Sequence, residues 1–281
     1  MLIGVIGNGF VGKATNQLKC KDIDIYAYDI NPKECIPKGI NLNDMKKCEI
    51  IFISVPTPMN KDESCHLKIL ESVVNNLNVI QYNGFIVIRS TIPPGTSDNL
   101  NCYFMPEFLT EKNFINDFIN NKEWVFGILG SERDSEFKSK ISNLFDLAFE
   151  NSRIEHNNLT FLLNKEAEMV KMFRNCFLST KVSFCNEMYQ FCEMKGINYE
   201  NVRKLATADD RILPSHSKVP GHDGKRGFGG TCFPKDTSSL RYEMKNIGMK
   251  PYIMDAIITR NEEVDRPSKD WESNKGRSVI E

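Results

Sequence analysis

The first eighteen residues contain the feature that most restricts how this chain can fold. Residues 2–6 form a short apolar run that leads directly into Gly7-Asn8-Gly9-Phe10-Val11-Gly12, and residues 13–18 can continue as a helix. A strand, a glycine turn and a helix in this order are typical of the first unit of a dinucleotide-binding sheet.

Each glycine of this motif has a distinct expected task. Gly7 allows the tight turn, Gly9 lets backbone N–H groups approach a pyrophosphate, and Gly12 permits close packing of the helix on the strand. The N-terminus of the helix then faces the anion. Phe10 and Val11, between the last two glycines, are further candidates for contact with the cofactor.

A carboxylate follows the next predicted strand. An alternating run at residues 23–28 ends at Asp29, 17 residues beyond Gly12. A carboxylate at this position accepts hydrogen bonds from a ribose 2′-hydroxyl and repels a 2′-phosphate, which favours NAD over NADP as the cofactor. The alternative is that Asp29 is only a turn residue before Asn31-Pro32.

Strands and helices continue to alternate after this point. The patterns fall at residues 50–55, 66–80, 85–90, 124–129 and 132–149. They predict an α/β fold with a Rossmann-type, doubly wound parallel sheet over residues 1–155. Ligands of such sheets bind at the carboxyl ends of the strands, where Val55-Pro56-Thr57-Pro58 and residues 90–96 fall. Thr57 and Thr91 are therefore candidates to line a nicotinamide pocket, although the prolines also suit rigid turns.

The second half is predicted to be an all-helical domain over residues 156–267 with a long central helix, followed by a polar tail at 268–281. Residues 164–195 contain no proline or glycine, so one helix of roughly 48 Å is expected. Its apolar positions favour packing against a second subunit, giving a homodimer, or against the chain's own domains. Lys171 and Asn175 are four residues apart and share a helix face, as a shared site or as a solvated edge.

One continuous segment combines more residues that favour chemistry than any other part of the chain. It is Gly227-Phe228-Gly229-Gly230-Thr231-Cys232-Phe233-Pro234-Lys235-Asp236. Glycines let the backbone approach a ligand, and an ammonium and a helix N-terminus beside a cysteine favour its thiolate form. Cys232 is thus a candidate nucleophile. The alternative is a glycine-rich turn with a buried thiol.

Charge and spacing exclude several other classes of protein. The 36 Lys and Arg balance 37 Asp and Glu, so nucleic acid is not expected as a partner. No apolar run approaches the roughly 18 residues of a membrane helix, and the N-terminus does not resemble a secretion signal, so a cytoplasmic protein is expected. The histidines lack ligand spacing and no metal is expected, while Cys176, Cys185 and Cys192 are expected in the core.

Taken together, these motifs resemble the UDP-glucose/GDP-mannose dehydrogenase family from the first strand to about Arg266. The resemblance rests on the motifs already quoted and on three others. These are Pro93-Pro94-Gly95-Thr96, Pro106-Glu107-Phe108-Leu109 and the stretch from Ala167-Glu168 to Asn175. Enzymes of this family oxidise the primary alcohol of a nucleotide sugar twice, reduce two NAD and hold the intermediate on a cysteine.

The resemblance implies a role for each candidate residue. Cys232 would form a thiohemiacetal and then a thioester, and Lys171 and Asn175 would stabilise oxyanions. Glu111 would be the general base for hydrolysis, supported by Glu107 four residues before it, and the assignment between these two glutamates stays open. Asp236 and Thr91 would position water or relay protons, and Lys235 would contact the cofactor. The substrate is expected to meet Glu107, Phe108, Leu109, Lys171, Asn175, Phe228 and Gly229.

The chain departs from the family pattern at several places. Met105 stands where the family usually has Asn, and Thr110-Glu111-Lys112 replaces Arg-Glu-Gly. The family continues into a third, nucleotide-binding domain, so a short form is expected here, with that domain absent or supplied by another polypeptide. Residues 220–226 add a basic glycine-rich insert, whose Lys225 and Arg226 suit either a diphosphate or an ordinary exposed loop.

Three functions remain open from the sequence. The first is the four-electron dehydrogenase, with UDP-glucose chosen as substrate by its frequency in the family. The second is a two-electron dehydrogenase of a small 3-hydroxy acid. Lys171 and Asn175 suit this chemistry as well, but it does not require Cys232. The third is a catalytically silent NAD-binding or partner-binding module.

Overall fold

The structure is a computed structural model that describes all residues, 1–281, and the chain divides into two compact units. The first unit comprises Met1–Thr57 and Leu67–Lys171. The second comprises Pro58–His66 and Met172–Glu281. The chain therefore leaves the first unit for nine residues after its third strand and then returns to it.

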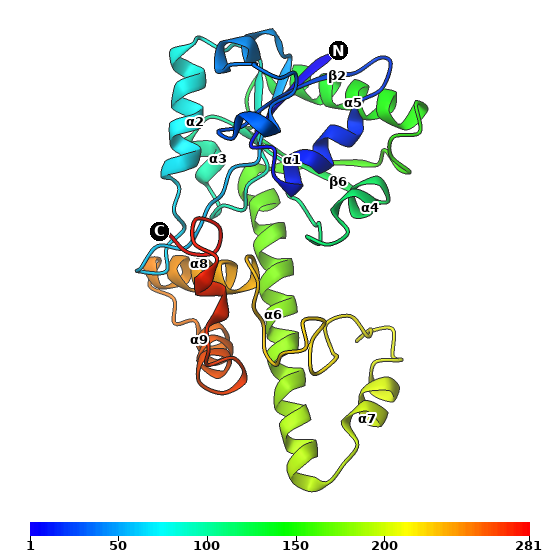
Figure 1. Cartoon of the computed structure of the whole chain (residues 1–281), viewed down its shortest axis with the longest axis vertical. Coiled ribbons are helices and arrows are strands. Elements are labelled where there is room, and N and C mark those ends of the chain that lie inside the picture. The colour runs from blue at the N-terminus through cyan, green and yellow to red at the C-terminus, as the bar shows by residue number, and fades with distance from the viewer. The chain divides into compact units, whose positions relative to one another are not determined.

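The first unit is built on a seven-stranded sheet (Figure 1) with the order β2-β1-β3-β4-β5-β6-β7. The strands are β1 (Leu2–Ile6), β2 (Asp24–Tyr28), β3 (Ile50–Ile53), β4 (Phe85–Ile88), β5 (Tyr103–Phe104), β6 (Trp124–Ile128) and β7 (Leu159–Leu163). The first five are parallel, as predicted. The sheet is mostly parallel. Its one antiparallel pair is β5 with β6, joined through Phe104 and Gly127, and β7 runs parallel to β6. β7 was not predicted, since its side chains are only partly buried and lack a clear alternation.

Helices cover both faces of this sheet. They are α1 (Phe10–Thr15), α2 (Lys68–Val79), α3 (Thr96–Asn99), α4 (Phe114–Ile119) and α5 (Asp134–Glu150), with short 3-10 turns at Asn16–Leu18, Pro32–Glu34 and Leu42–Lys47. Side chains from α1, α4 and α5 pack into one hydrophobic core, and side chains from α2 pack into a second core on the other face. The sheet is therefore doubly wound, as the alternating sequence pattern predicts.

Burial on both faces explains why the central strands are apolar at every position. All four residues of β3 are fully buried, and every residue of β1 after Leu2 is buried as well. A strand that meets helices on both sides cannot place a polar side chain toward water, so its sequence shows no alternation. This property made β1 and β3 recognisable from the sequence.

The second unit is helical (Figure 1). Its helices are α6 (Asn164–Lys195), which begins in the first unit, α7 (Tyr199–Ala206), α8 (Phe233–Asn246) and α9 (Tyr252–Arg260), followed by a π-helical turn (Asn261–Asp265) and a 3-10 turn (Asp270–Ser273). The predicted long helix has the bounds of α6. Cys176, Cys185 and Cys192 are buried, which confirms their expected place in the core. No helix of the chain combines the length and apolar character needed to cross a membrane.

The loop after β3 and the C-terminal residues pack together in this unit. The amide of Met59 donates to Ser278, and the amide of Ile280 donates to Met59, at 2.9 and 3.0 Å. Trp271 and Ser278 are buried. Residues 268–281 are polar in composition, yet they have a defined position because they pair with residues 58–66, a contact that no local pattern indicates.

Truncation of a buried aromatic residue in the first unit should destabilise it strongly. Phe126 is fully buried, and its ring centroid lies 5.5 to 6.1 Å from those of three other phenylalanines. We expect Phe126→Ala to lower the free energy of unfolding by about 3 to 5 kcal/mol, measured by urea denaturation. Phe149→Ala is the matched control, because Phe149 is 44% exposed and should change stability by less than about 1 kcal/mol. Equal losses in both variants would contradict this description of the core.

Candidate active site

The glycine loop after β1 has a backbone that only glycine can supply at two positions. Gly7 has a φ of +86°, and a Cβ atom on Gly12 would lie 2.2 Å from the carbonyl oxygen of Gly7. At Gly9, by contrast, a Cβ atom would meet nothing within 4 Å. Open space at Gly9 and the tight approach at Gly12 fit a backbone that a diphosphate contacts directly. Phe10 and Val11 are both partly buried in the first turn of α1.

Asp29 lies beside this loop at the end of β2. One carboxylate oxygen accepts a hydrogen bond from the amide of Asn8 at 2.7 Å, and the other accepts one from the amide of Asn31 at 2.8 Å. The bond to Asn31 is that of a turn residue, and the bond to Asn8 joins the carboxylate to the glycine loop. The two interpretations of Asp29 are therefore compatible. Each oxygen keeps a lone pair for a ribose hydroxyl.

The loops after β3 and β4 are joined by two side-chain hydrogen bonds. The hydroxyl of Thr57, which is buried, donates to the carbonyl of Thr91 at 2.7 Å, and the hydroxyl of Ser90 donates to the carbonyl of Val55 at 2.6 Å. These loops are at the carboxyl ends of parallel strands, where ligands of doubly wound sheets bind. The threonines that the sequence singled out are therefore in contact with each other.

Glu107 and Lys171 form a buried ion pair in the first unit. The Lys171 Nζ donates to the Glu107 Oε1 at 2.6 Å and to the Glu107 carbonyl at 2.8 Å, and the amide of Leu109 donates to the second carboxylate oxygen at 2.9 Å. Burial raises the pKa of Glu107, but the charge of Lys171, these hydrogen bonds and the charge of Arg89 outweigh it and hold that pKa below its ordinary value. Glu107 is therefore ionised and fixes the position of the Lys171 ammonium.

The structure places the two candidate glutamates in different surroundings. The Lys171 Nζ lies 5.9 Å from the centre of the Phe108 ring, so Glu107 and Phe108 both lie beside this ammonium, while the amide of Leu109 bonds to the Glu107 carboxylate. Glu111 lies on an exposed turn four residues further along the chain. Of the two carboxylates, Glu107 is thus the one in contact with Lys171, while Glu111 is open to solvent.

Arg89 is a residue of this region that the sequence did not reveal. It is only 2% exposed, its guanidinium donates to the hydroxyl of Thr15, and it lies 5.5 Å from the centre of the Phe118 ring. Burial lowers the pKa of Arg89 to about 10, and the charge of Glu107 acts in the opposite direction. An arginine at the end of a strand ordinarily indicates a surface position, so only the packed structure identifies it as buried.

In the second unit, Asp236 connects Asn175 with Lys235. The Asn175 Nδ2 donates to one carboxylate oxygen at 2.6 Å, and the Lys235 Nζ donates to the other at 2.6 Å. Asp236 is 1% exposed and Asn175 is 8% exposed. Burial would lower the pKa of Lys235, but the negative charge of Asp236, and that of Cys232 and Cys65 in their thiolate forms, hold it above its ordinary value.

Cys232 is the residue that precedes α8, at the N-terminal end of the helix that carries Lys235 and Asp236. Its sulfur is 3.7 Å from the hydroxyl of Thr231, and it is only partly buried. It is also close enough to the Lys235 ammonium for their charges to interact. A partly exposed cysteine with a cation and a helix N-terminus beside it has the environment of a reactive thiol.

The cations of the insert before the cysteine loop already have carboxylate partners. Lys225 pairs with Asp270 and Arg226 pairs with Glu193, both at 2.6 Å. An ion pair must be broken or shared before either cation binds a phosphate, so these contacts favour the structural alternative for the insert.

Phe228 and Gly229, the two substrate candidates in the cysteine loop, are both packed against other parts of the protein. Phe228 is buried, and the space beside Gly229 is filled by the guanidinium of Arg266.

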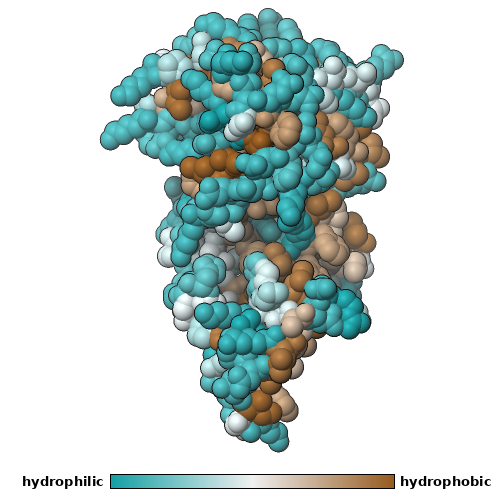
Figure 2. Space-filling model, turned by 90° about the vertical axis from the view of Figure 1, so that its right-hand side faces the viewer, coloured by the Kyte–Doolittle hydropathy of each residue, from teal (hydrophilic) through white to brown (hydrophobic).

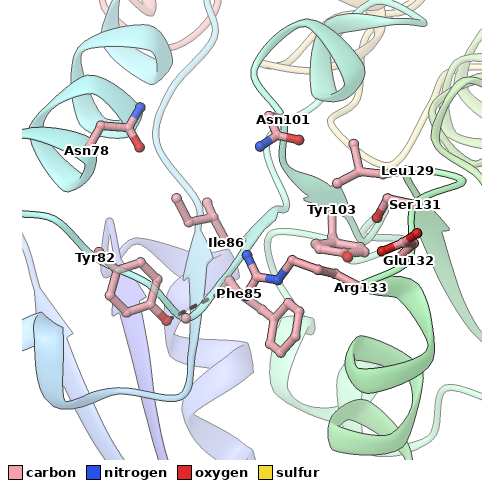
Figure 3. Close-up of a pocket in the computed structure, with 11 residues that line it drawn as sticks. Asn78, Tyr82, Phe85, Ile86, Asn101, Tyr103, Leu129, Ser131, Glu132 and Arg133 are labelled. Carbon is pink, nitrogen blue, oxygen red and sulfur yellow. Dashed lines mark hydrogen bonds between the residues drawn. The ribbon is translucent and has the colours of Figure 1, made fainter.

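A cavity of about 380 Å³ lies elsewhere in the first unit (Figure 3). It is lined by Asn78, Tyr82, Gly84, Phe85, Ile86, Asn101, Tyr103, Leu129, Ser131, Glu132 and Arg133. Arg133 reaches into it, with its guanidinium 4.7 Å from the centre of the Phe85 ring. Phe85 and Tyr103 are the first residues of β4 and β5, whereas the glycine loop follows the last residue of β1. The cavity is therefore at the amino ends of the parallel strands, and the glycine loop is at their carboxyl ends. It contains none of the candidate residues and is not the candidate site.

Comparison with known proteins identifies the family. A profile of the NAD binding domain of the UDP-glucose/GDP-mannose dehydrogenase family matches residues 40–146, and a profile of the central domain of the same family matches residues 165–263. The chain belongs to this family. Its cofactor is therefore NAD. The glycine loop and Asp29 precede the matched residues, so their assignment rests on the geometry described above.

Individual relatives agree with this family. The UDP-glucose 6-dehydrogenase of Rickettsia bellii is 31% identical over 80% of this chain and 51% of its own length. A UDP-glucose dehydrogenase from Pyrobaculum islandicum has a TM-score of 0.77 and 23% identity, over 93% of this chain and 68% of that one. A 3-hydroxyisobutyrate dehydrogenase from Mycobacterium tuberculosis has a TM-score of 0.72 and 11% identity, over 99% and 96%. At these identities the two structures show a shared fold.

The chain spans between about half and two thirds of the length of the curated relatives that it matches, 51% of one and 66% of another.

Breaking the buried ion pair should cost far more stability than breaking an exposed one. We expect Glu107→Gln to lower the free energy of unfolding at pH 7 by about 3 to 5 kcal/mol, because the Lys171 ammonium is left buried without its partner. The matched control is Glu49→Gln, which breaks a 2.7 Å pair with Lys140 whose side chains are 38% and 32% exposed, and which should cost less than about 1 kcal/mol.

The same ion pair should make stability depend on pH. The pKa of Glu107 is lower in the folded chain than its ordinary value of 4.5, so the stabilisation is complete above that pH and is lost as pH falls through the folded value. Urea denaturation between pH 7 and pH 3 measures this loss in the wild type, and Glu107→Gln should show less of it. An unchanged pH dependence in that variant would assign the loss to other carboxylates.

Proposed function

We propose that this protein is an NAD-dependent nucleotide-sugar dehydrogenase that oxidises UDP-glucose to UDP-glucuronate with Cys232 as its nucleophile. The observation that carries the proposal is the buried Asn175, Asp236 and Lys235 network at the beginning of α8, directly after a partly exposed cysteine. A buried carboxylate and ammonium have a large desolvation cost, so their presence beside a thiol favours a chemical role over a structural one.

Cys232 supplies covalent capture of the intermediate in this proposal. Its thiolate adds to the carbon of the aldehyde formed in the first oxidation, and the carbonyl oxygen becomes the hydroxyl of a thiohemiacetal after it takes up a proton. The second oxidation removes a hydride and a proton and leaves a thioester. Water then adds to the thioester carbonyl, the carbon–sulfur bond breaks, and the carboxylate and the thiol are released. Capture prevents the aldehyde from escaping between the two oxidations.

NAD, when bound, accepts the hydride that the substrate loses in each oxidation. The residues that would hold it are the glycine loop at residues 7–12, Asp29 for a ribose, Thr57 and Thr91 at the ends of β3 and β4, and Lys235. Their fit is supported by the open space at Gly9 and by the free lone pairs of the Asp29 carboxylate.

The remaining candidates divide by charge and exposure. Lys171, whose ammonium is fixed by Glu107, would stabilise the oxyanion that develops on the substrate, and Asn175, one turn further along α6, would donate a hydrogen bond. Asp236 would orient Asn175 and, with Thr91, hold water or relay a proton. Glu111, whose carboxylate is exposed, would be the base that activates water for thioester hydrolysis.

UDP-glucose is proposed as the substrate because it appears in the names of the relatives. Phe108, Leu109, Phe228 and Gly229 are proposed to line its binding site. The alternative is a GDP-sugar, since the family also includes GDP-mannose dehydrogenases.

A second candidate function is a two-electron dehydrogenase of a small hydroxy acid. It is favoured by the fold shared with the 3-hydroxyisobutyrate dehydrogenase, which extends over 96% of that chain. That chemistry needs a cation and an amide such as Lys171 and Asn175, but it forms no covalent intermediate. The role of Cys232 therefore distinguishes the two candidates.

The ratio of NADH formed to substrate consumed tests the proposal directly. The purified protein is incubated with NAD and a panel of UDP- and GDP-sugars, and we expect two NADH for each sugar in the wild type. In Cys232→Ser the second oxidation or the release of acid should be blocked. Cys20→Ser is the matched control, because Cys20 is also a partly buried thiol and has no proposed role.

Other outcomes of this experiment select another function. One NADH for each substrate, unaffected by Cys232→Ser, would favour the two-electron dehydrogenase. Binding of NAD without formation of NADH would favour a silent or partner-dependent module.

We also propose that two copies of the chain associate along α6. Phe173, Phe177, Phe184 and Phe191 are 53 to 62% exposed and lie on one face of this helix, and Figure 2 shows apolar side chains on the surface of the helical unit. The rings of Phe173 and Phe177 are stacked, with centroids 6.2 Å apart. This stripe extends over roughly 27 Å of helix. A second copy supplies a matching stripe, since a two-fold axis brings the same surface of both subunits together.

A charge within the stripe should prevent this association. We expect the wild type to sediment as a dimer and Phe184→Glu to sediment as a monomer, because the carboxylate would lose its hydration in the interface. Phe149→Glu, at a position on α5 that is 44% exposed, is the control and should remain a dimer. A monomeric wild type, or a dimer in both variants, would contradict this interface.

A further inference from the structure

The loop before Cys232 is rich in glycine, so its sequence alone allows many backbone conformations. The loop must be restricted to one of them if the thiol is to have a single position. Three of the four residues 227–230 are glycine, and Gly227 and Gly230 have φ values of +68° and +73°. Glycine has more backbone conformations to lose on folding than any other residue. α8 holds the C-terminal end of this loop from Phe233 onward, so a second attachment is needed at its N-terminal end.

Asn261 makes that attachment. Its side-chain oxygen accepts the backbone N–H of Phe228 at 2.8 Å, and its side-chain amide donates to the carbonyl of the same residue at 2.9 Å. Both residues are buried, with 1% and 4% exposure. A Cβ atom on Gly227 would lie 2.3 Å from the Asn261 Oδ1, so the loop approaches the amide more closely than a side chain would allow. Asn261 thus binds both polar groups of one loop residue, as a neighbouring strand would.

The loop residues on either side of Phe228 are also contacted by side chains from outside the loop. The amide of Gly227 donates to the Asn186 Oδ1 of α6 at 3.2 Å, and the guanidinium of Arg266 fills the space beside Gly229. Gly227 and Phe228 are therefore each hydrogen-bonded by an asparagine from outside the loop, and Arg266, whose guanidinium is bonded to Asp223 and Asp270, packs against Gly229. Asn261 also opens the π-helical turn, a rare conformation that is frequent at functional sites.

We propose that Asn261 is a positioning residue for catalysis, which holds the loop in the one conformation that places the Cys232 sulfur at the N-terminus of α8. The inference rests on the proposed role of Cys232 as nucleophile. An asparagine suits this task because it provides a donor and an acceptor for the two backbone groups of a single residue and adds no charge near the thiolate. Loss of its donor leaves the Phe228 carbonyl buried without a partner, and the glycines allow the loop to move instead.

Asn261→Asp tests the proposal, because aspartate keeps the shape of asparagine and one acceptor but places an oxygen against the Phe228 carbonyl. We expect kcat to fall by on the order of 100-fold, as misplacement of a reacting group does, with KM and the Kd of NAD unchanged. The rate of Cys232 alkylation by iodoacetamide, followed by peptide mass spectrometry, should fall at pH 7 and its pH profile should move to higher pH. Asn261→Gln keeps the amide but lengthens the side chain and should show the same changes to a smaller extent.

The matched control is Asn198→Asp, in the same unit. Asn198 accepts the amide of Asn201 at the start of α7 through its side-chain oxygen, which aspartate retains, so kcat and alkylation should not change. Wild-type kcat and an unchanged alkylation profile in Asn261→Asp would overturn the inference. Loss of kcat together with weakened NAD binding and an unchanged alkylation profile would make the role of Asn261 merely structural and would overturn it as well.

The alkylation profile keeps this test separate from that of the proposed function. It reports on the environment of Cys232 even if no nucleotide sugar is oxidised. Full turnover in Cys232→Ser would refute the proposed function, while a displaced alkylation profile in Asn261→Asp would still support the attachment of the loop. Should Asn261→Asp fail to fold, as judged by circular dichroism, the same measurements on Asn261→Gln decide the matter.

Discussion

The structure depends on one unusual face of α6, where buried polar side chains recur at every turn. Asn164, Glu168, Lys171, Asn175, Ser179, Ser183 and Asn186 are each at most 8% exposed and are spaced three or four residues apart. The face opposite to them carries the exposed phenylalanines. A helix of an isolated globular domain ordinarily shows the reverse arrangement. The polar face of α6 is satisfied by hydrogen bonds to the loops that it meets, and its apolar face is the surface proposed to bind a second copy.

Five of these polar side chains, those of Asn164, Glu168, Lys171, Asn175 and Asn186, bind residues outside the helix, while the Ser179 hydroxyl donates to the carbonyl of Asn175 within it. Within the first unit, the carboxylate of Glu168 accepts the amides of Gly95 and Ser97, and Lys171 binds Glu107. Within the second unit, Asn175 binds Asp236 and Asn186 binds Gly227. Buried ion pairs and amide contacts of this kind contribute little net stability, because the cost of desolvation offsets most of their attraction. Their value lies in specificity, since each segment has one position that satisfies the buried group.

The sequence predicted those parts of the fold that depend on local pattern. β3 is a run of four apolar residues, and α6 lies in a stretch without proline or glycine, so both were recognisable. The direction of β6, the existence of β7 and the pairing of residues 58–66 with the C-terminal residues depend on contacts between distant segments. No period or turn signal encodes those contacts, and they were therefore not predicted.

The same distinction applies to the candidate site. Cys232 was recognisable because glycine, cysteine, lysine and aspartate form one continuous motif, which ordinary folding rarely requires. Arg89 and Asn261 were not, because an isolated arginine or asparagine most often lies at the surface. Their burial follows from partners far along the chain, Thr15 for Arg89 and Phe228 for Asn261. The proposed nucleophile thus lies in a local sequence motif, while Arg89 and Asn261 are recognised only through their contacts with distant residues.

The cysteine loop shows a physical reason why the residues that attach it lie elsewhere in the chain. In the proposed mechanism the substrate must approach Cys232 closely, which glycine in the neighbouring chain allows, but glycine cannot by itself hold a conformation. The rigidity must come from side chains outside the loop, and here it comes from neutral asparagines on α6 and on the π-helical turn. A cation in their place would compete with Lys235 for the thiolate, and an anion would oppose its formation. Attachment through uncharged amides leaves Lys235, the Asp236 carboxylate and the N-terminus of α8 to determine the electrostatics of Cys232.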